Sequence, residues 1–336
     1  MKKEWKVALV GAHGLVGKSM IEDLFRLDFP MDCLTLYGSK EHANVPIKIN
    51  GTLYPVLVLN EENIQPFDLV FFSGNEEIAE KYAPLFIKKG AVVIDNSSFF
   101  RMHKDVPLVI PEINKEDILE HHGLIANPNC TTIILLVALS ALHEKYHLEK
   151  IYVSTYQSSS GAGKEALEEL KKESKDQDYI AQILPSHNAK KKTLYDNVLP
   201  VVDDFLDNGF TKEEMKVRFE SKKILHLPEL EVNVTCARVA TTIGHAMSVM
   251  AVFKEKVDVD EAIHLLKQNN SIKVFIAPDY PTLEEIRNEP YIAVGRLKKD
   301  LDCDYTLDLF ITGDNLVRGA SYNAIQIGWA LWKLEK

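Results

Sequence analysis

Residues 6–17 decide the fold of the first part of this chain: Lys6-Val7-Ala8-Leu9-Val10, then Gly11-Ala12-His13-Gly14-Leu15-Val16-Gly17. The apolar run before the first glycine is typical of a short buried strand, and a helical pattern extends from Ser19 to Leu27. Glycines at this G-x-x-G-x-x-G spacing let the backbone approach a pyrophosphate, whose charge the N-terminus of the following helix attracts. The stretch therefore predicts a nucleotide-binding turn, although a tight strand-to-helix turn without a ligand has the same pattern.

Up to about residue 125, short apolar segments alternate with segments of helical pattern. This alternation predicts an α/β domain with a doubly wound, Rossmann-like parallel sheet. Polar residues follow two of the expected strands, at Ser73-Gly74-Asn75 and at Asp95-Asn96-Ser97-Ser98, and such sheets bind ligands at these strand ends. The further expected elements are strands at 33–37, 69–72, 91–94 and 108–110 and a helix at 76–89.

The pattern changes after residue 130. The expected strands become longer, and their alternation fits a mixed or antiparallel sheet with one packed face. We expect a dinucleotide-binding domain over residues 1–129, completed by the C-terminal segment 316–336 with a helix from Leu316 to Leu334, and a second, α+β domain over residues 130–315. The elements expected in the second domain are strands at 151–157, 231–240 and 247–253 and helices at 164–175 and 211–225.

A lone cysteine in Asn127-Pro128-Asn129-Cys130-Thr131-Thr132 stands where a turn opens into the apolar run 133–139. A thiol in the first turn of a helix lies near unpaired backbone N–H groups, whose partial positive charge favours the thiolate. The alternative is a buried structural cysteine, which is the commoner environment of a free cysteine. Motifs elsewhere in the chain favour a nucleophile.

The residues after the second expected strand bear on the choice of nucleotide. An NAD-binding unit usually carries an acid there, about 20 residues after the glycines, to hold the ribose 2′-hydroxyl. Here Ser39 and Lys40 come first, and a hydroxyl and a cation suit the 2′-phosphate of NADP. Asp32 and Glu41 suit NAD instead, and Lys40 has a second interpretation as a solvated loop charge. We expect NADP.

Composition limits the partners of the protein. Thirty-nine basic and forty-nine acidic side chains leave a net charge of −10, which disfavours nucleic acid. We find no apolar stretch of the ~18 residues that a membrane span needs, and the Met1-Lys2-Lys3-Glu4 start lacks the apolar segment of a signal peptide. We therefore expect a cytoplasmic protein without a membrane or nucleic-acid partner. The four cysteines are scattered, so neither a disulfide framework nor a zinc ribbon is expected.

The segment His143-Glu144-Lys145-Tyr146-His147 matches the H-E-x-x-H signature of zinc proteases. It falls at the end of the helix that begins beside Cys130, and no third ligand is evident downstream. The pair His121-His122 is no better as a metal site. We expect no bound metal.

A series of motifs in order along nearly the whole chain resembles the aspartate-β-semialdehyde dehydrogenase family. The motifs are Gly11–Gly17, Val93–Ser98, Val106–Asn114, Asn127–Cys130, Ser154–Gln157, Ser160–Gly163, Thr211–Lys216, Gly244-His245 and Gly313–Asn315. The resemblance implies reduction of L-aspartyl-4-phosphate to the semialdehyde with NADPH and release of phosphate. It also implies a place in the route to lysine (through diaminopimelate), methionine and threonine.

The resemblance implies a role for each matching residue. Cys130 forms a thioester with the substrate, which divides one difficult substitution into two easier steps. His245 acts as general acid and base, because an imidazole titrates near neutral pH. Gln157 orients the substrate. Standing alone, His245 would be interpreted as a structural histidine after a glycine turn.

By the same resemblance, Arg238 binds the α-carboxylate of the substrate, and a planar guanidinium suits two carboxylate oxygens. Glu213 binds the substrate ammonium, and Lys216 binds the phosphate together with Arg101 and Asn129. Glu213 and Lys216 lie three residues apart on one expected helix, so the alternative interpretation of these two residues is a surface ion pair.

The family pattern implies a homodimer built through the second domain's sheet, and contacts to the cofactor. The implied cofactor contacts are Gly11, His13, Gly14, Leu15, Val16, Gly17, Ser39, Lys40, Ser73, Gly74, Ser160, Gly161, Asn315 and Gln326. The chain departs from the pattern where His13 replaces a threonine, where Lys40 replaces an arginine, and on both sides of Gly244-His245, at 240–243 and 246–248. These departures concern cofactor preference and the packing around His245.

Two other functions stay open at this point. One is a relative with the same thioester chemistry and another acyl substrate, such as N-acetylglutamyl phosphate or malonyl-coenzyme A, which lacks the free ammonium that Glu213 would bind. The other is a nucleotide-binding paralogue without turnover, against which the presence of both Cys130 and His245 argues.

Overall fold

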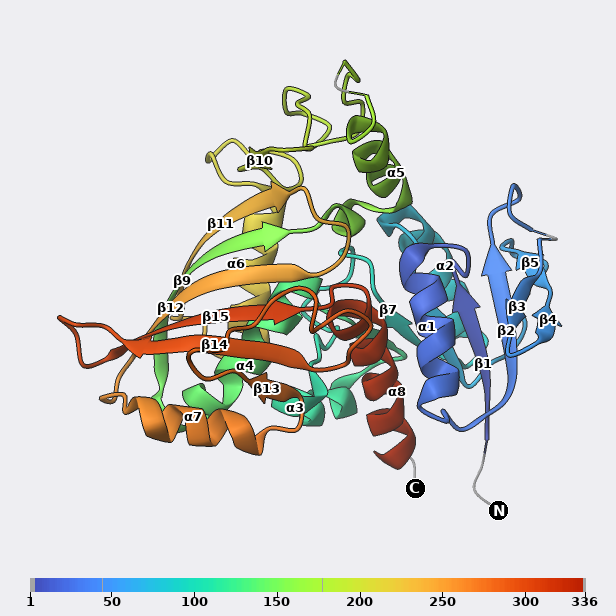
Figure 1. The fold of residues 1–336 in the computed structure, drawn as a ribbon. Coiled ribbons are helices and arrows are strands. Elements are labelled where there is room, and N and C mark those ends of the chain that lie inside the picture. The colour runs from blue at the N-terminus through green and yellow to red at the C-terminus, as the bar shows by residue number, and fades with distance from the viewer. Residues whose placement is uncertain (1–3, 44, 177, 335–336) are drawn as a thin grey trace. The chain divides into compact units, whose positions relative to one another are not determined.

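Two compact units make up the protein in the computed structural model, which describes residues 4–43, 45–176 and 178–334 (Figure 1). The first unit comprises residues 1–129 and 320–336, and the second comprises residues 130–319. Each unit has a sheet of its own. The chain therefore leaves the first unit once and returns to it at its C-terminal end.

The first unit is built on a six-stranded sheet in the order β5-β2-β1-β6-β7-β8, and every pair of neighbours is parallel. This order, with β1 central and strands added on both sides, confirms the predicted doubly wound sheet. The strands are β1 Trp5–Val10, β2 Met31–Gly38, β5 Val56–Val58, β6 Leu69–Phe72, β7 Val92–Asp95 and β8 Leu124–Ala126. The other elements are the hairpin β3 Ile47–Ile49 and β4 Thr52–Tyr54 and the helices α1 Leu15–Arg26, α2 Glu76–Lys88, α3 Pro111–Asn114, η1 Lys115–Glu120 and α8 Tyr322–Leu334.

Two neighbouring residues of β6 show how helices cover both faces of this sheet. Side chains alternate between the faces of a strand. Phe71 belongs to the apolar cluster that includes residues of α1 and α8. Phe72 points the other way, and its ring lies 5.6 Å from that of Phe86 in α2. Both faces are thus buried, which explains why the strands read as continuous apolar runs.

The glycine-rich turn joins β1 to α1 as predicted, and the helix begins at Leu15, four residues earlier than expected. Gly11 has φ +85°, a conformation that other residues rarely adopt. At Gly17, a Cβ atom would lie 2.2 Å from the Gly11 carbonyl oxygen. The turn therefore needs glycine at both positions.

The expected strand at 108–110 is wrong. Leu108 forms only an isolated parallel bridge, to Ala126 at the end of β8, which is the last strand of the sheet. Prolines at 107 and 111 bracket the segment, and the second of them starts α3. Because proline lacks a backbone N–H group, a longer ladder could not form there.

The second unit is built on a seven-stranded mixed sheet in the order β10-β11-β9-β12-β15-β14-β13. The pairs β9–β11 and β13–β14 are parallel, and the other pairs are antiparallel. A mixed sheet was predicted. The strands are β9 Leu148–Gln157, β10 Val198–Leu199, β11 Glu231–Val239, β12 His245–Phe253, β13 Ile272–Val274, β14 Ile292–Lys299 and β15 Thr306–Gly313. The helical elements are α4 Cys130–Tyr146, η2 Ser159–Ala162, α5 Lys164–Glu173, α6 Lys212–Ile224 and α7 Val259–Gln268.

Helices cover one face of this sheet, and α4 lies at the centre of that layer, in contact with α6, α7 and β9 (Figure 1). Every residue of α4 from Thr131 to Ser140 is buried. A helix that is apolar on all sides suits such a position. Along β9, exposed residues such as Tyr152 and Ser154 alternate with buried ones, so the opposite face of the sheet is open.

The expected C-terminal helix from Leu316 is wrong in its first turn. A π-helical segment, Val317–Ser321, precedes α8. The Asp314 carboxylate starts this segment, because its Oδ1 accepts hydrogen bonds from the N–H groups of Leu316 and Val317 at 2.9 and 3.0 Å. Within this segment, the N–H group of Gly319 donates to the carbonyl of Asp314 at 2.9 Å.

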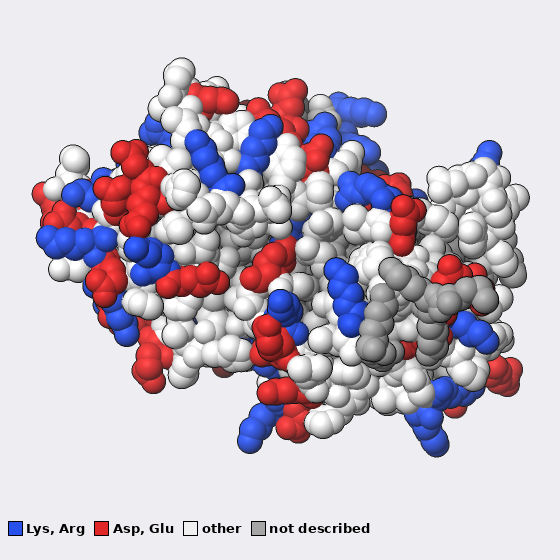
Figure 2. Space-filling model, turned by 90° about the horizontal axis from the view of Figure 1, so that it is seen from below, with Lys and Arg blue, Asp and Glu red and all other residues white. Residues whose placement is uncertain are grey.

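Lysine and arginine side chains are interspersed with aspartate and glutamate on the face that Figure 2 shows. Opposite charges alternate there rather than forming a field of one sign. Within residues 4–43, 45–176 and 178–334, none of the helices combines the length and apolar character needed to cross a bilayer.

Candidate functional site

Cys130 is the first residue of α4, and its sulfur faces a histidine from β12. The Sγ atom lies 3.4 Å from Nε2 of His245, although 115 residues separate the two in sequence. Cys130 is partly exposed, whereas Cys236 is buried, and burial raises the pKa of the Cys236 thiol. Position at a helix start, access and an adjacent imidazole are the conditions that make a cysteine nucleophilic.

His245 is fully buried, and a backbone hydrogen bond orients its ring. The backbone N–H group of Ser158 donates to Nδ1 at 3.2 Å, which directs Nε2 toward the sulfur. Burial lowers the pKa of His245 to about 4, the charge of Arg238 acts in the same direction, and Glu213 opposes both. The ring is therefore neutral at neutral pH.

Two glycines lie close to the Cys130–His245 pair. At Gly319, a Cβ atom would lie 2.7 Å from the Cβ of Cys130. At Gly161, it would lie 2.9 Å from Nη1 of Arg238 and 3.4 Å from Nε2 of His245. Both glycines allow backbone to pack directly against the reactive side chains.

Gln157 and Glu213 form a hydrogen-bonded group with the residue that follows the cysteine. Nε2 of Gln157 donates to Oγ1 of Thr131 at 3.0 Å and to Oε1 of Glu213 at 3.2 Å. The Thr131 hydroxyl donates to the same carboxylate oxygen at 3.2 Å. Glu213 is 6% exposed. The group ties the start of α4 to β9 and α6, and it presents a buried negative charge.

Arg238, in β11, is a buried cation beside this group and is 3% exposed. Its Nη1 donates to the Ser158 carbonyl at 2.7 Å, but its buried Nε has no hydrogen-bond partner among the residues that the structure describes. Burial lowers the pKa of Arg238, and Glu213 and Cys130 raise it. A buried guanidinium with an unused donor suits an anionic ligand.

Lys216 lies one turn along α6 from Glu213, and their charged groups are 3.7 Å apart. Its ammonium also donates to Oδ2 of Asp203 at 2.7 Å. The alternative of an ordinary surface pair does not fit, because Glu213 is buried and its other oxygen bonds to Gln157 and Thr131.

Asn315 holds together the segments on either side of the histidine. Its Oδ1 accepts from the N–H group of Gly244 at 2.8 Å and from the hydroxyls of Ser158 and Ser160 at 3.2 and 3.1 Å. The amide is 3% exposed. Of the predicted cofactor contacts, Ser160, Gly161 and Asn315 thus lie beside His245.

The first unit carries the other predicted cofactor contacts. Gly14 is the N-cap of α1 and makes no side-chain cap, so Leu15 and Val16 begin the helix with backbone N–H groups that no side chain caps. Ser73 follows β6 and donates to the carbonyls of Val10 and Gly11, and Gly74 precedes the N-cap of α2. A glycine turn that leads into a helix start without side-chain caps fits a pyrophosphate.

The loop after β2 contains Ser39 and Lys40, and also His42, which belongs to no motif. Ser39 Oγ lies 3.0 Å from Nδ1 of His42. The His42 ring lies 5.3 Å from the ring of His13, whose Nε2 is 3.1 Å from the Val45 carbonyl. Burial lowers the pKa of His13. His13, which stands where the family pattern has a threonine, therefore packs on this loop.

Arg101 is buried at the carboxyl end of the parallel sheet. Its Nε donates to the Asn127 carbonyl at 3.0 Å, and its Nη2 donates to the Asn96 carbonyl at 2.7 Å. Asn129 is buried in the same unit. Gln326 lies on α8 and donates to Glu112 at 3.0 Å.

The H-E-x-x-H segment does not form a helical pair of ligands. His143 lies in α4, and its Nδ1 accepts from the Leu148 N–H group at 3.1 Å. His147 lies beyond the helix with φ +59°. No group of three metal-ligating side chains is present among the described parts of the chain.

Four residues support this geometry in ways that the sequence did not predict. Ser158, Thr131 and Asn315 act through hydrogen bonds to residues far away in sequence, and Asp203 lies in an irregular loop. Asn315 was expected only as a cofactor contact. A resemblance assigns roles to matched positions and says little of the residues that support them.

Two family models match the chain. One is described as "Semialdehyde dehydrogenase, NAD binding domain" and matches residues 6–121, and the other is described as "Semialdehyde dehydrogenase, dimerisation domain" and matches residues 139–318. A parallel dinucleotide-binding sheet and a second unit with a cysteine–histidine pair thus define the class as that of the semialdehyde dehydrogenases.

Full-length relatives narrow this class. Aspartate-semialdehyde dehydrogenase of Bacillus subtilis (strain 168) is 39% identical over 337 residues, which cover 98% of this chain and 97% of that protein. The crystal structure of aspartate semialdehyde dehydrogenase II from Vibrio cholerae is 36% identical, with a TM-score of 0.93 over 98% of this chain and 99% of that one. The same enzyme complexed with ASA is 37% identical, with the same TM-score and coverage. The chain belongs to the aspartate-semialdehyde dehydrogenase family, which confirms the resemblance seen in the motifs.

Proposed function

We propose that the protein catalyses the reversible, NADP-dependent reduction of L-aspartyl-4-phosphate to aspartate 4-semialdehyde and phosphate. The observation that carries the proposal is the 3.4 Å approach of the Cys130 sulfur to Nε2 of His245, with Arg238, Glu213 and Gln157 around it. The names of the relatives support the substrate. The reaction would serve amino-acid biosynthesis, in the route to lysine, methionine and threonine.

In the proposed mechanism, the Cys130 thiolate attacks the acyl carbon of the substrate. A carbon–sulfur bond forms, the bond from carbon to the phosphate oxygen breaks, and phosphate leaves. NADPH, held by residues of the turn Gly11–Gly17, would supply the hydride for reduction of this thioester. His245 exchanges the proton of the resulting hemithioacetal, whose carbon–sulfur bond then breaks to release the aldehyde and restore the sulfur.

The charges of the site suit an amino acid as substrate. Arg238, with its unused Nε donor, is proposed to bind the α-carboxylate, and Glu213 the ammonium. N-Acetylglutamyl phosphate and malonyl-coenzyme A lack an ammonium, so neither could form an ion pair with the buried Glu213 carboxylate. Lys216, Arg101 and Asn129 remain the proposed phosphate contacts.

The residues of the first unit fit NADP. The turn Gly11–Gly17 would hold the pyrophosphate at the start of α1, and Ser39 and Lys40 would hold the 2′-phosphate. We accordingly assign cofactor binding to residues 1–129 and 316–336, and catalysis and dimerisation to residues 130–315.

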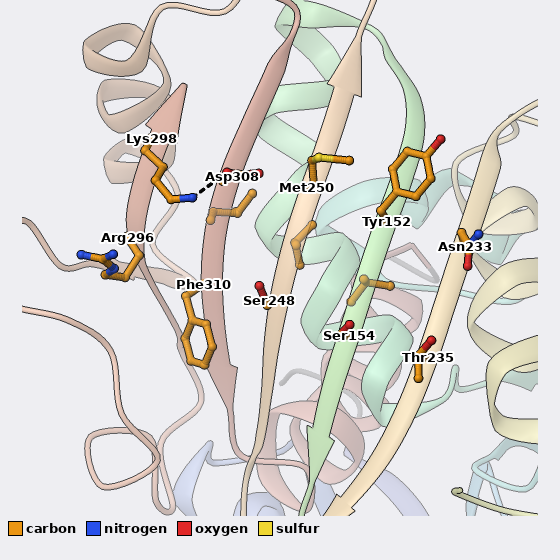
Figure 3. A pocket seen from close by; sticks show the side chains of 13 residues that line it. Tyr152, Ser154, Asn233, Thr235, Ser248, Met250, Arg296, Lys298, Asp308 and Phe310 are labelled. Carbon is orange, nitrogen blue, oxygen red and sulfur yellow. Dashed lines mark hydrogen bonds and ion pairs between the residues drawn. The ribbon is translucent and has the colours of Figure 1, made fainter. Parts of the chain in front are cut away.

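The open face of the second unit's sheet is the proposed dimer interface. Tyr152, Met250 and Phe310 project from it, and Asp308 pairs with Lys298 at 2.6 Å (Figure 3). A hollow of about 540 Å³ lies between these side chains. The lining mixes these aromatic and apolar side chains with polar ones such as Ser154 and Thr235, and mixed surfaces of this kind are typical of the interfaces between protein chains.

We expect Tyr152→Glu to separate the dimer, because it places a charge on a face that association would bury. Sedimentation velocity should give a dimer for the natural protein and a monomer for the variant. Tyr280→Glu is the control, since Tyr280 is 58% exposed and lies outside this face. Equal sedimentation of the Tyr152 variant and the natural protein would contradict the proposed interface.

The proposed activity is tested by phosphate-dependent reduction of NADP⁺ with aspartate semialdehyde, followed by absorbance in the reverse direction. We expect turnover with aspartate semialdehyde and phosphate together and little with either omitted. Rates with NAD⁺ test the cofactor assignment. N-Acetylglutamate semialdehyde tests the role of Glu213, and equal turnover of the two aldehydes would refute the assigned substrate.

A further inference from the structure

Asp203 forms an ion pair with the ammonium of Lys216. The two groups are 2.7 Å apart, and about a quarter of each side chain is exposed. Glu213, at 3.7 Å, is the second carboxylate near the same ammonium. Asp203 also contributes to the field at Arg238, whose pKa is lowered first by burial and is raised by carboxylates that include Asp203.

The Asp203 carboxylate is fixed in place. Its backbone has φ +67°, a left-handed conformation that aspartate and asparagine tolerate better than most residues. Its Oδ1 accepts the N–H group of Asp204 at 2.8 Å, which leaves Oδ2 for Lys216. The short Asp203 side chain therefore holds the longer, flexible side chain of Lys216.

Buried glutamates of α5 anchor the irregular segment that leads to Asp203. Both oxygens of Glu169 accept backbone N–H groups from the three consecutive residues 182–184. One oxygen of Glu173 accepts those of residues 194 and 195 at 2.9 Å. Each glutamate is 1% exposed. These bonds fix residues 182–184 and 194–195 to α5.

We propose that Asp203 is a positioning residue that aims the Lys216 ammonium and, through its own negative charge, limits the affinity of the site for phosphate. The inference rests on the proposed function of Lys216 as a phosphate contact. A phosphate dianion that approaches Lys216 meets repulsion from Asp203. The same repulsion favours departure of phosphate after the acyl transfer.

The test is Asp203→Asn, because asparagine keeps the left-handed backbone and an oxygen that can accept from Lys216 while the charge is removed. We expect the KM for inorganic phosphate to fall roughly three- to tenfold, with a smaller change in the KM for aspartate semialdehyde, because Asp203 is the last of the charges that act on Arg238. Asp204→Asn is the matched control. Asp204 bonds to the N–H groups of residues 187 and 188 and to Lys212, so this variant should leave the phosphate KM unchanged.

A binding measurement separates this inference from the proposed function. Titration of the protein with inorganic phosphate, followed by its melting temperature, should give tighter binding for the Asp203 variant than for the natural protein. Lys216→Met should abolish the phosphate effect in both backgrounds. An unchanged or weaker phosphate affinity in Asp203→Asn would overturn the inference, whether or not the natural protein reduces NADP⁺. Failure of that reduction alone would overturn only the proposed reaction.

Discussion

Cys130→Ala should reduce turnover by roughly four orders of magnitude or more, because it removes the atom that is proposed to become acylated. The affinity for NADPH should stay within about twofold of the natural value, since the sulfur lies on the second unit and the glycine turn on the first. The measurements are the rate of NADP⁺ reduction and a fluorescence titration with NADPH.

A matched control for this substitution is Cys33→Ala. Cys33 is an exposed free cysteine of β2 and should be replaceable without loss of rate. Mass spectrometry of the natural protein, quenched during the reaction, should show added acyl mass on Cys130. Turnover by Cys130→Ala within tenfold of the natural rate would contradict covalent catalysis.

His245→Asn should lower kcat by roughly 10²- to 10⁴-fold, the range of general acid–base catalysis, with a much smaller change in KM. Asparagine can still accept the Ser158 N–H group, but it cannot exchange a proton at the position of Nε2. Because burial keeps the pKa of His245 at about 4, the ring is neutral in the free enzyme. The profile of kcat/KM between pH 6 and 8 should therefore show no ionisation of this ring.

His264→Asn is the control for this variant. His264 is an exposed histidine of α7 whose Nε2 lies 2.9 Å from the Gln268 amide. Steady-state kinetics of both variants give the comparison. A loss confined to KM in His245→Asn would recast the histidine as a binding residue.

Local pattern predicted the parts of the fold that depend on neighbours in sequence. The apolar run of β1 and the glycines after it specify a strand and a turn by themselves, because Gly11 needs a positive φ and Gly17 has no room for a Cβ atom. The prediction of a strand at 108–110 was wrong because it rested on local pattern alone. The segment is as apolar as a strand, but it is bracketed by prolines at 107 and 111 and pairs with β8 only through the single bridge at Leu108.

The candidate site depends on distances that no local pattern encodes. Nothing near Cys130 in sequence indicates that His245 lies 3.4 Å away, and the expectation that they meet came from the family resemblance. Ser158 holds the ring through its backbone N–H group, which any residue but proline would supply. Asp203 acts from a loop whose course is set by contacts with α5. Such roles become visible only in three dimensions.

The contact of Gly319 with Cys130 has a consequence for redesign of this enzyme. A glycine packs against the Cβ atom of Cys130, so position 319 offers no side chain that could be exchanged to admit a different acyl group. A change of substrate would instead be sought at Glu213 and Arg238, on α6 and β11, which are proposed to bind the amino-acid part of the substrate. Libraries aimed at new products would vary those two positions and leave 130 and 319 untouched.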